Sequence, residues 1–496
     1  MQQYLLGIDV GTTGTKTLLI AADGRVISHA YRSYEILAPA VGFSEQRAED
    51  WWEAVVATVR ETVSAVDHPE DVKAISLSLQ GGTVVPVDAA YRPLRNAIVW
   101  NDGRAGEQFE EFVREGGSDR YTYETCGWHM AAGLPALEVR WIRDHQPEIF
   151  DRTARFLTVP DYISWKMTGR AVTDLADAGI NEFCDIRRGV YDEKLMAFAG
   201  IGPGQLAQLA HTGDLIGPLT PAAAEELGLT TDTVLVTGAH DQYAVAVGAG
   251  ANEAGDVVVG SGTAWVVTGI FDEPLFESGL AQSVAAPPGK WGSLFSLSTG
   301  GICMEWLRCQ IAGGLTYEEI NRKTAGRMPA CDELFFYPFM GIAGVDKRFS
   351  RASFVGLDLS HDMYDQMSAV MEGVVFQTRW MMESFKDRSD GIIRLAGGAT
   401  KSPVWTQMIA DIFGRPVLVP EIADLSCIGA AVIAGWGAGL YGSVQEGCQA
   451  LRISGRQIEP DPERAAVYEH AYTAYKKQAQ YLFDLYTASN GSHTSQ

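Results

Sequence analysis

The residues of this chain best suited to chemistry are an aspartate and the turn of small residues that follows it. Asp9 lies near the end of the apolar run 4–10, and the turn 11–14 leads into a second apolar run. Glycines let the backbone point N–H groups at an anion, and the threonines of the turn add hydroxyl donors. A carboxylate beside such a turn can hold a cation next to that anion. The pattern fits a magnesium nucleotide, and a plain β-hairpin with an aspartate in a tight turn fits it equally.

A second copy of this pattern lies far down the chain. The segment 256–267 again has an apolar run, a turn of Gly, Ser and Thr residues, and another apolar run. Two such hairpins predict two related domains, each of which presents a small-residue turn to one side of the same phosphate chain.

Asp241 is the candidate general base. It follows the predicted strand 234–237 and opens a stretch of small residues, 243–250, that we expect to be helical. Phosphoryl transfer to a hydroxyl needs a carboxylate within hydrogen-bond reach of the attacking oxygen. The alternative is that Asp241 caps the helix, and the residues alone favour this alternative. We interpret the neighbouring His240 as a packing or hydrogen-bonding residue.

The elements that must position these residues occur in two similar series. Strands are predicted at 4–10, 16–21, 26–34, 72–79 and 84–87, with an amphipathic helix at 46–66. After about residue 250 the order restarts, with strands at 256–260, 264–270 and 292–297 and a long helix at 364–386. A strand meander followed by crossover helices, twice over, predicts an α/β protein with mixed sheets. Trp100 is interpreted as a core residue.

Composition limits the class of protein. A chain of 496 residues is too long for one core and suits two domains. With 62 acidic and 39 basic residues the net charge is −23, which disfavours nucleic acids and anionic membranes as partners. The seven cysteines include no C-x-x-C pair, which fits a reducing compartment. Because no signal peptide or membrane span is recognised, a cytoplasmic location is predicted, and a homodimer is left open.

Five segments, taken in order, resemble the FGGY family of carbohydrate kinases. They span most of the chain and read GIDVGTTGTK (7–16), IVWNDGR (98–104), GAHDQ (238–242), GSGTAW (260–265) and AGGATKS (396–402). The resemblance implies an α/β fold of two ribonuclease H-like domains, of the actin, hexokinase and heat-shock ATPase type, around an interdomain cleft. It implies an N-terminal, sugar-binding domain at 1–247 and a C-terminal, ATP-binding domain at 248–496.

The resemblance also implies the roles of individual residues. Asp241 would be the catalytic base, and Asp9 would position Mg²⁺. The residues implied for the sugar are Gln80, Gly81, Gly82, Asn101, Asp102, Arg104 and Gln242. Those implied for ATP are Gly11, Thr12, Thr13, Lys16, Gly262, Thr263, Gly301, Gly397, Gly398 and Ser402. Two alternatives stay open, because Lys16 could be a solvated strand residue and Asp102 with Arg104 could form a structural ion pair.

The implied activity is ATP-dependent phosphorylation of a sugar hydroxyl. Within the family the IVWNDGRA run is most similar to xylulokinases, which favours a ketose or pentulose such as xylulose. Two departures keep other acceptors open, namely ribulose, fuculose, erythritol, glycerol or an autoinducer-type compound. Gly81 and Gly82 replace a Met-His pair of xylulokinases, from which we expect a wider pocket, and the loop 341–346 differs from theirs. An actin- or chaperone-like ATPase is the alternative from another class.

Overall fold

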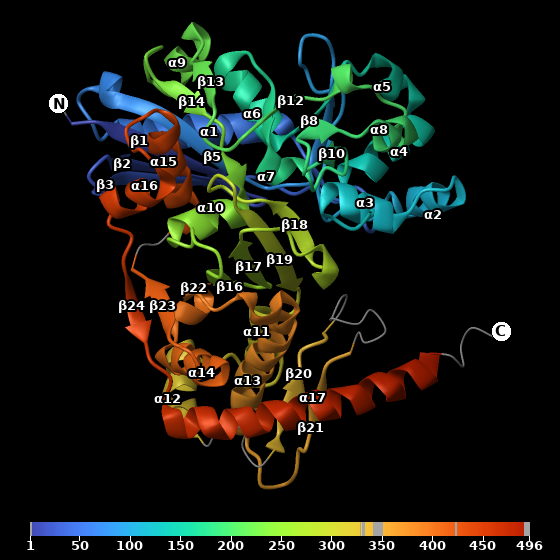
Figure 1. The fold of residues 1–496 in the computed structure, drawn as a ribbon, viewed down its shortest axis with the longest axis vertical. Helices are drawn as coiled ribbons and strands as arrows, with labels where there is room; N and C mark the ends of the chain where they lie inside the picture. The colour runs from blue at the N-terminus through green and yellow to red at the C-terminus, as the bar shows by residue number, and fades with distance from the viewer. Residues whose placement is uncertain (1, 328, 330–332, 341–350, 422–423, 491–496) are drawn as a thin grey trace. The chain divides into compact units, whose positions relative to one another are not determined.

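The computed structural model describes the chain except residues 1, 328, 330–332, 341–350, 422–423 and 491–496 (Figure 1). The chain forms two compact units. The first unit contains Met1–Asn252, Ile270–Ser293 and Ile422–Ile453, and the second contains Glu253–Gly269, Leu294–Glu421 and Ser454–Gln496. A single boundary after residue 247 was predicted, but the first unit also contains two segments from later in the chain. Within the described ranges, no helix is both long and apolar enough to cross a lipid bilayer.

The first unit is built on a mixed sheet with the strand order β13-β14-β5-β1-β2-β3. Strand β1 runs antiparallel to β2 and parallel to β5, and the short β15 pairs in parallel with the end of β5. The strands are β1 (Tyr4–Val10), β2 (Gly14–Ala21), β3 (Val26–Ser33), β5 (Val72–Leu79), β13 (Leu215–Pro218), β14 (Val234–Val236) and β15 (Ala239–His240).

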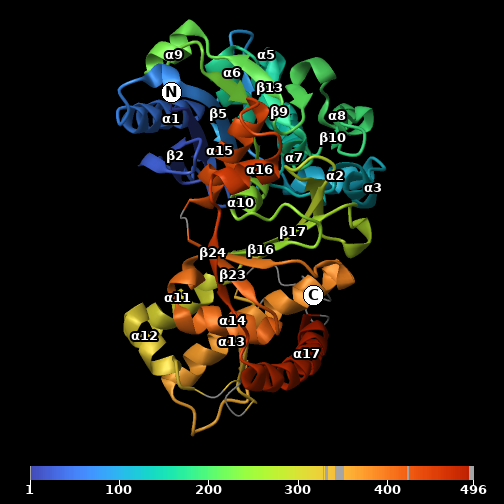
Figure 2. The same ribbon diagram turned by 60° about the vertical axis from the view of Figure 1, so that its left-hand side comes forward.

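The alternation of side chains along β1 explains how this sheet is covered on both faces. Leu6, Ile8 and Val10 are buried in one core with the apolar side of helix α1 (Ala48–Val63). The opposite face of the strand lies against helix α15 (Leu425–Gly437). A β-carbon on Gly7 would lie 1.8 Å from the carbonyl oxygen of Cys427, so only glycine permits this approach. Figures 1 and 2 show α1 and α15 on opposite faces of the sheet.

Helix α10 (Asp241–Gly248) packs against α15 backbone to backbone. A β-carbon on Gly429 would lie 1.9 Å from the carbonyl oxygen of Ala244, and one on Gly248 would lie 1.9 Å from that of Leu425. These two glycines therefore set the separation of the helices. Because Asp241 is the first residue of α10, its position relative to the sheet depends on this contact.

The remaining elements of the first unit form a second sheet, β4-β7-β6-β8, with helices around it. Its strands are β4 (Glu45–Gln46), β6 (Val84–Val87), β7 (Ala97–Ile98) and β8 (Arg155–Thr158). The other helices are α2 (Gly106–Arg114), α3 (Asp119–Cys126), α4 (Pro135–His145), α5 (Pro147–Arg152), α6 (Val159–Thr168), α7 (Leu175–Ala178), α8 (Glu193–Ala199), α9 (Pro221–Leu227) and α16 (Val444–Ala450). Short strands complete the first unit: β9 (Val172–Asp174), β10 (Cys184–Asp185), β11 (Val190–Tyr191) and β12 (Gln208–Ala210).

The second unit repeats the strand order of the first. Its sheet runs β18-β19-β17-β16-β22-β23-β24, with β16 antiparallel to β17 and parallel to β22, as β1 is to β2 and β5. The predicted duplication of a strand meander is therefore confirmed in topology. The strands are β16 (Val257–Ser261), β17 (Trp265–Phe271), β18 (Ala281–Val284), β19 (Trp291–Leu297), β22 (Ile393–Gly397), β23 (Val417–Pro420) and β24 (Gly455–Ile458).

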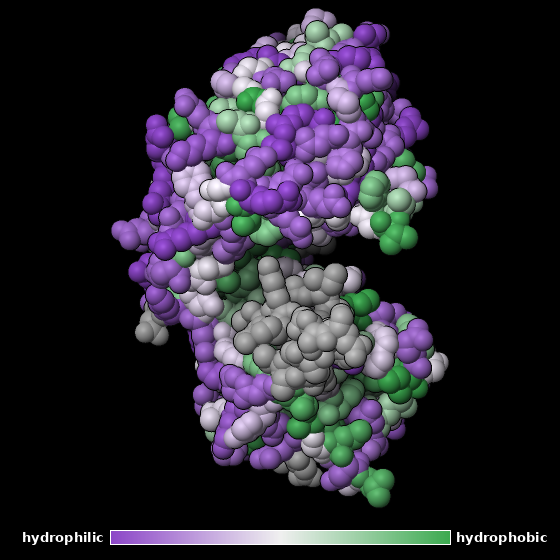
Figure 3. Space-filling view, turned by 90° about the vertical axis from the view of Figure 1, so that its right-hand side faces the viewer, coloured by the Kyte–Doolittle hydropathy of each residue, from purple (hydrophilic) through white to green (hydrophobic). Residues whose placement is uncertain are grey.

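Helices and a small hairpin complete the second unit. The hairpin pairs β20 (Phe335–Tyr337) with β21 (Ser353–Val355), and the helices are α11 (Gly301–Gln310), α12 (Tyr317–Thr324), α13 (Met363–Met382), α14 (Pro403–Phe413) and α17 (Pro462–Asn490). Helix α17 is fixed by buried tyrosines, and the Tyr468 hydroxyl donates to Glu372 at 2.8 Å. The face drawn in Figure 3 is covered mainly by hydrophilic residues, as the charge of the chain leads one to expect.

Candidate functional site

Parallel strands of the first sheet bring the two predicted carboxylates, Asp9 and Asp241, to the same strand ends. Asp9 of β1 lies beside Lys16 of β2 and Ser78 of β5 in the strand register. Strand β15 pairs with the end of β5, and Asp241 follows β15 directly. The two carboxylates interact electrostatically, because the charge of Asp241 contributes to a raised pKa at Asp9.

Asp9 is a buried carboxylate with little compensation. Burial raises its pKa to about 6, the Ser78 and Ser426 hydroxyls act in the opposite direction, and Asp241 raises the pKa further. The Ser78 hydroxyl donates to Asp9 Oδ1 at 2.8 Å. A cation would relieve the buried charge, and oxygen donors suit Mg²⁺. In the described part of the chain no three His, Cys, Asp or Glu side chains form a metal cage, and Asp9 is the carboxylate here that could hold a Mg²⁺ ion.

Asp241 does not cap its helix. The N-cap of α10 is His240, whose Nδ1 accepts a hydrogen bond from the Gln242 N–H at 3.3 Å. The capping alternative for Asp241 is therefore wrong. Burial lowers the pKa of His240, which keeps the ring neutral although its Nδ1 lies 3.1 Å from Asp241 Oδ1. The Asp241 side chain remains 34% exposed, so a partly accessible carboxylate stands at the start of the helix.

The turn between β1 and β2 is anchored through its carbonyl groups. The Tyr34 hydroxyl donates to the Gly11 carbonyl, Gln46 Nε2 donates to that of Thr12 at 2.6 Å, and the Tyr34 N–H donates to that of Thr13 at 3.3 Å. The N–H groups of Thr12 and Thr13 donate to no atom of the described residues. Fixed carbonyls and unpaired N–H groups form the arrangement that binds an anion.

The turn between β16 and β17 uses the same arrangement. The N–H groups of Gly301 and Ile302, at the start of α11, donate to the carbonyls of Gly262 and Thr263 at 3.2 and 3.1 Å. Within the described ranges, the N–H groups of Gly262 and Thr263 again have no acceptor. The two hairpins predicted from the sequence are thus similar in their hydrogen bonding as well as in their residues.

A cavity of about 500 Å³ opens beside this second turn, wholly within the second unit. It contains five of the predicted nucleotide residues, namely Gly262, Thr263, Gly301, Gly398 and Ser402. Four further lining residues were not predicted, namely Glu305, Tyr317, Asn321 and Trp405. Glu305 lies four residues after Gly301 on one helix face, which is the signal that could have found it.

Gly397, also predicted, lies just outside this lining and shapes it. Its φ is 89°, and a β-carbon there would lie 2.8 Å from the carbonyl oxygen of Ser261. The backbone after β22 can therefore approach β16 only with glycine at this position.

The residues predicted to bind the sugar differ in exposure and in pairing. Gln80 is buried, and its Oε1 has no hydrogen bond within the described ranges. Asn101 is exposed. Arg104 is held by Asp102 at 2.8 Å and Glu45 at 2.9 Å, and its own side chain is 1% exposed. This is the geometry of the structural ion pair.

Lys16, which was predicted for ATP, forms an ion pair with Asp424 at 3.1 Å.

The expected wider pocket at Gly81 and Gly82 is not found. A β-carbon on Gly81 would lie 2.6 Å from Asp177 Oδ1 and 2.7 Å from the His240 ring. One on Gly82 would lie 3.0 Å from the Leu134 side chain. Other side chains therefore occupy the space that the glycines leave. The loop 341–346 lies outside the described residues.

The interpretation of Trp100 as a core residue is wrong. Its side chain is 47% exposed, and its Nε1 donates to the Thr12 hydroxyl at 3.1 Å. Trp100 therefore supports the first hairpin, which the sequence pattern did not indicate.

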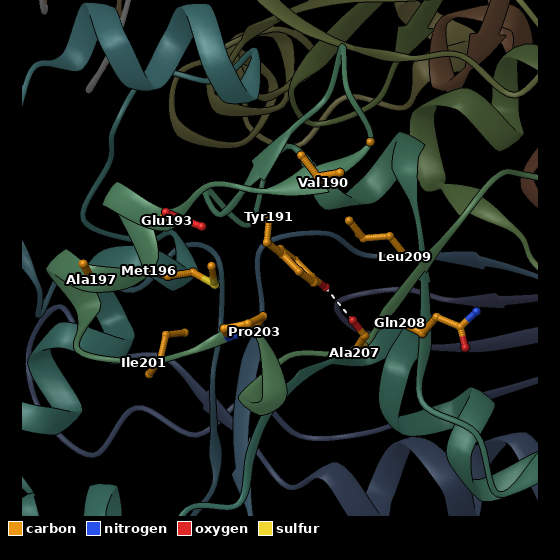
Figure 4. Close-up of a pocket in the computed structure, with 11 residues that line it drawn as sticks. Val190, Tyr191, Glu193, Met196, Ala197, Ile201, Pro203, Ala207, Gln208 and Leu209 are labelled. Atoms are coloured by element: carbon orange, nitrogen blue, oxygen red, sulfur yellow. Dashed lines mark hydrogen bonds between the residues drawn. The ribbon is translucent and has the colours of Figure 1, made fainter.

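A further cavity of about 570 Å³ in the first unit contains none of the predicted residues (Figure 4). Its lining includes Tyr191, Met196, Pro203 and Leu209, and the Tyr191 hydroxyl donates to the Ala207 carbonyl at 2.8 Å. Glu193 is the one carboxylate of this lining, and no Gly/Thr turn stands beside it, so we assign no chemistry to the cavity.

The duplicated meander and the two anchored turns define a class of protein, the actin, hexokinase and heat-shock ATPase type built from two ribonuclease H-like domains. Models of the N- and C-terminal domains of the FGGY family of carbohydrate kinases match residues 4–248 and 257–438. The chain belongs to this family.

Relatives of known name agree on the class and differ in the acceptor. The chain is 27% identical over 494 residues to xylulose kinase from Bacillus subtilis (strain 168), covering 98% of both chains. It is 29% identical over 458 residues to gluconokinase from the same organism, covering 89% of this chain and 88% of the other. The crystal structure of xylulose kinase from Rhodospirillum rubrum superposes with a TM-score of 0.91 at 26% identity, covering 98% of this chain and 100% of that one.

Proposed function

We propose that the protein transfers the γ-phosphoryl group of ATP to a hydroxyl of a ketose or polyol, with Asp241 as the general base. The observation that carries the proposal is the position of Asp9 and Asp241 at one sheet edge beside a turn with unpaired N–H groups. A cation site, an anion site and an accessible carboxylate are the groups that this reaction needs.

Each group has one task in the proposed reaction. The Asp241 carboxylate accepts the proton of the attacking hydroxyl, while neutral His240 holds the start of α10 through the Gln242 N–H. The N–H groups of Thr12 and Thr13 bind phosphate oxygens without moving, because their carbonyls are already fixed. Bound Mg²⁺, next to Asp9, supplies positive charge to the phosphates.

The nucleotide is assigned to the cavity of the second unit. The N–H groups of Gly262 and Thr263 line it at one side, and Ile302, Tyr317 and Trp405 provide apolar surface for a nucleoside. A volume of about 500 Å³ lies within the usual range for ligands of this size.

A xylulose-like ketose is the proposed acceptor, supported by the similarity to xylulose kinases at full length. Gluconate is the second candidate, because gluconokinase is similarly related. We favour the neutral sugar: Arg104, the cation expected at the acceptor, is engaged by Asp102 and Glu45 and is not available for a carboxylate.

The test is a coupled assay of ADP release over pentuloses, hexuloses, polyols and gluconate, with Asp241→Asn and the exposed control Asp67→Asn. We expect acceptor-dependent ADP release from the wild type and from Asp67→Asn. Asp241→Asn should lose more than about 99% of kcat and keep its affinity for ADP. An Asp241→Asn protein with about a tenth of wild-type turnover would remove Asp241 from the role of base. ADP release that no acceptor stimulates would favour the actin-like ATPase alternative.

A further inference from the structure

Two buried glutamines of the first unit lie beside the turn between β1 and β2. Gln46 belongs to β4, and Gln80 directly follows β5. Their exposed fractions are 1% and 3%. The resemblance to known kinases implied a contact of Gln80 with the sugar and no role for Gln46. A buried amide is placed by its hydrogen bonds, so the partners of these two side chains indicate what they do.

The two side chains form a chain of amides that ends at the turn. Gln80 Nε2 donates to Gln46 Oε1 at 2.9 Å, and Gln46 Nε2 donates to the Thr12 carbonyl at 2.6 Å. This carbonyl shares a planar peptide group with the Thr13 N–H, which donates to no atom of the described residues. Because a planar group turns as one body, the direction of that N–H depends on the bond from Gln46.

Neither amide can be turned over without loss. Gln46 Oε1 also accepts from Trp51 Nε1 at 3.1 Å, so the oxygen of Gln46 faces two donors and its nitrogen faces a carbonyl. A turned Gln46 amide would bring donors against donors and an oxygen against the carbonyl. A turned Gln80 amide would bring its oxygen against Gln46 Oε1. The donors of the chain therefore all point toward the turn.

The hydrogen bonds of Gln80 lead to β1 and its turn. Its N–H donates to the Val10 carbonyl at 3.1 Å, and its Nε2 donates to Gln46. Its Oε1 is enclosed by the protein and has no donor within the described ranges. An enclosed oxygen cannot accept from a sugar hydroxyl without a rearrangement of its surroundings. These contacts favour a role for Gln80 in the turn over a contact with the sugar.

We propose that Gln46 and Gln80 are positioning residues, which together hold the peptide group between Thr12 and Thr13 in the orientation that binds the transferred phosphoryl group. The inference rests on the proposed function, because it takes the phosphates to bind at this turn. It reassigns Gln80 from the acceptor to the phosphates and adds Gln46 to the residues on which the reaction depends.

This role has a kinetic signature. Fixed N–H groups stabilise the charge that develops on the transferred phosphoryl group, and a misdirected donor loses part of this stabilisation. When the chain of amides is broken, kcat should therefore fall by about tenfold or more. The KM for the acceptor should stay within about twofold, because no contact with the acceptor is removed. A side chain that binds the sugar would instead raise the KM for the acceptor.

The experiment is steady-state ADP release by the full-length protein with D-xylulose, the expected acceptor, or else with the best acceptor of the screen above. The variants are Gln46→Met, Gln80→Met and the double variant. Each single variant should lose about tenfold or more of kcat. Because the two side chains act through one peptide group, the double variant should lose no more than about twofold beyond the slower single variant.

Trp51→Phe is the matched control. It removes the third bond to Gln46, at a position as buried as Gln46, and leaves both links of the chain in place. It should keep kcat within about twofold of the wild type, and melting temperatures show which variants are folded. If Gln46→Met does not fold, Gln46→Glu replaces it, because a carboxylate keeps the bonds to Oε1 and loses only the donor to Thr12.

Three results would overturn the inference and leave the proposed function standing. The first is a wild-type kcat in both single variants. The second is a Gln80→Met variant with an unchanged kcat and a raised KM for the acceptor. The third is a double variant in which the two losses multiply. A wild-type protein whose ADP release no acceptor of the screen stimulates would defeat the proposed function, and this inference with it.

Discussion

The contact between α10 and α15 gives a sharp test of how packing positions the proposed base. In Gly429→Ala the new methyl group would lie 1.9 Å from the Ala244 carbonyl oxygen, and 2.7 Å from the carbonyl carbon. A carbon and an oxygen without a strong bond normally stay about 3.3–3.6 Å apart. The contact consists of backbone atoms, so no side chain can rotate away. The two helices must separate by roughly 1.5 Å.

This displacement should affect both stability and turnover. Overpacking of this kind costs about 1–3 kcal/mol of the free energy of unfolding. Asp241 begins the displaced helix, three residues before Ala244. Because misplacement of a reacting group by about 1 Å can cost about 10²-fold in rate, kcat should fall by about that factor. The KM for ATP should change less than kcat, because the nucleoside cavity belongs to the other unit.

The assays are thermal unfolding and steady-state ADP release with the best acceptor, and Gly106→Ala is the control. Gly106 begins helix α2, its φ is not in the left-handed region, and no atom lies within 4 Å of a β-carbon there. The control should be as stable as the wild type or more stable by up to about 1 kcal/mol. A Gly429→Ala protein with wild-type melting temperature and kcat would refute the argument that this glycine pair sets the position of Asp241.

Three further predictions concern single side chains. Asp9→Asn should raise the Mg²⁺ concentration for half-maximal activity by about tenfold or more, and an unchanged magnesium titration would contradict the assignment of Asp9. Burial raises the pKa of Asp161 from 3.8 to about 6. Between these two values the folded protein keeps the proton of Asp161, whereas the unfolded chain has lost it. The free energy of unfolding should therefore fall by about 3 kcal/mol as the pH rises from about 4 to about 6. In denaturant unfolding, Asp161→Asn should not show this decrease in the free energy of unfolding. If the pH profiles of the variant and the wild type are parallel, the prediction for Asp161 is wrong. Ser402→Ala removes the cap on the Trp405 N–H and should cost about 1 kcal/mol in the same measurement, whereas an unchanged midpoint would show that the cap is replaced.

The sequence was most informative where local pattern and tertiary burial agree. The strands 4–10, 72–79 and 84–87 have the predicted bounds, because apolar residues fill them and turn residues end them. Helix α3 (Asp119–Cys126) was missed, since its polar and aromatic residues show no apolar face. Residues 425–435 of helix α15 are all buried, so no apolar periodicity marks where this helix begins.

The two turns of the candidate site could be predicted from the sequence, but the side chains that line the nucleotide cavity could not. Glycines and threonines between two strands indicate an anion-binding turn from a few consecutive residues. Glu305 could have been found from its spacing to Gly301, whereas Asn321 lies on another helix and joins the cavity lining through Ser402, so no local spacing identifies it. The cap role of His240 and the exposure of Trp100 likewise depend on contacts between distant segments.

The place of α15 in the chain has a consequence for folding during synthesis. The helix that covers Gly7 is translated more than 400 residues after it, as the hydrogen bond between Cys427 and the Lys16 carbonyl, 411 residues apart, illustrates. A ribosome-bound chain ending near residue 250 lacks the helix that covers one side of β1, and that side stays uncovered by α15 until residues 425–437 have been synthesised. A circular permutant that begins with this helix would remove the delay.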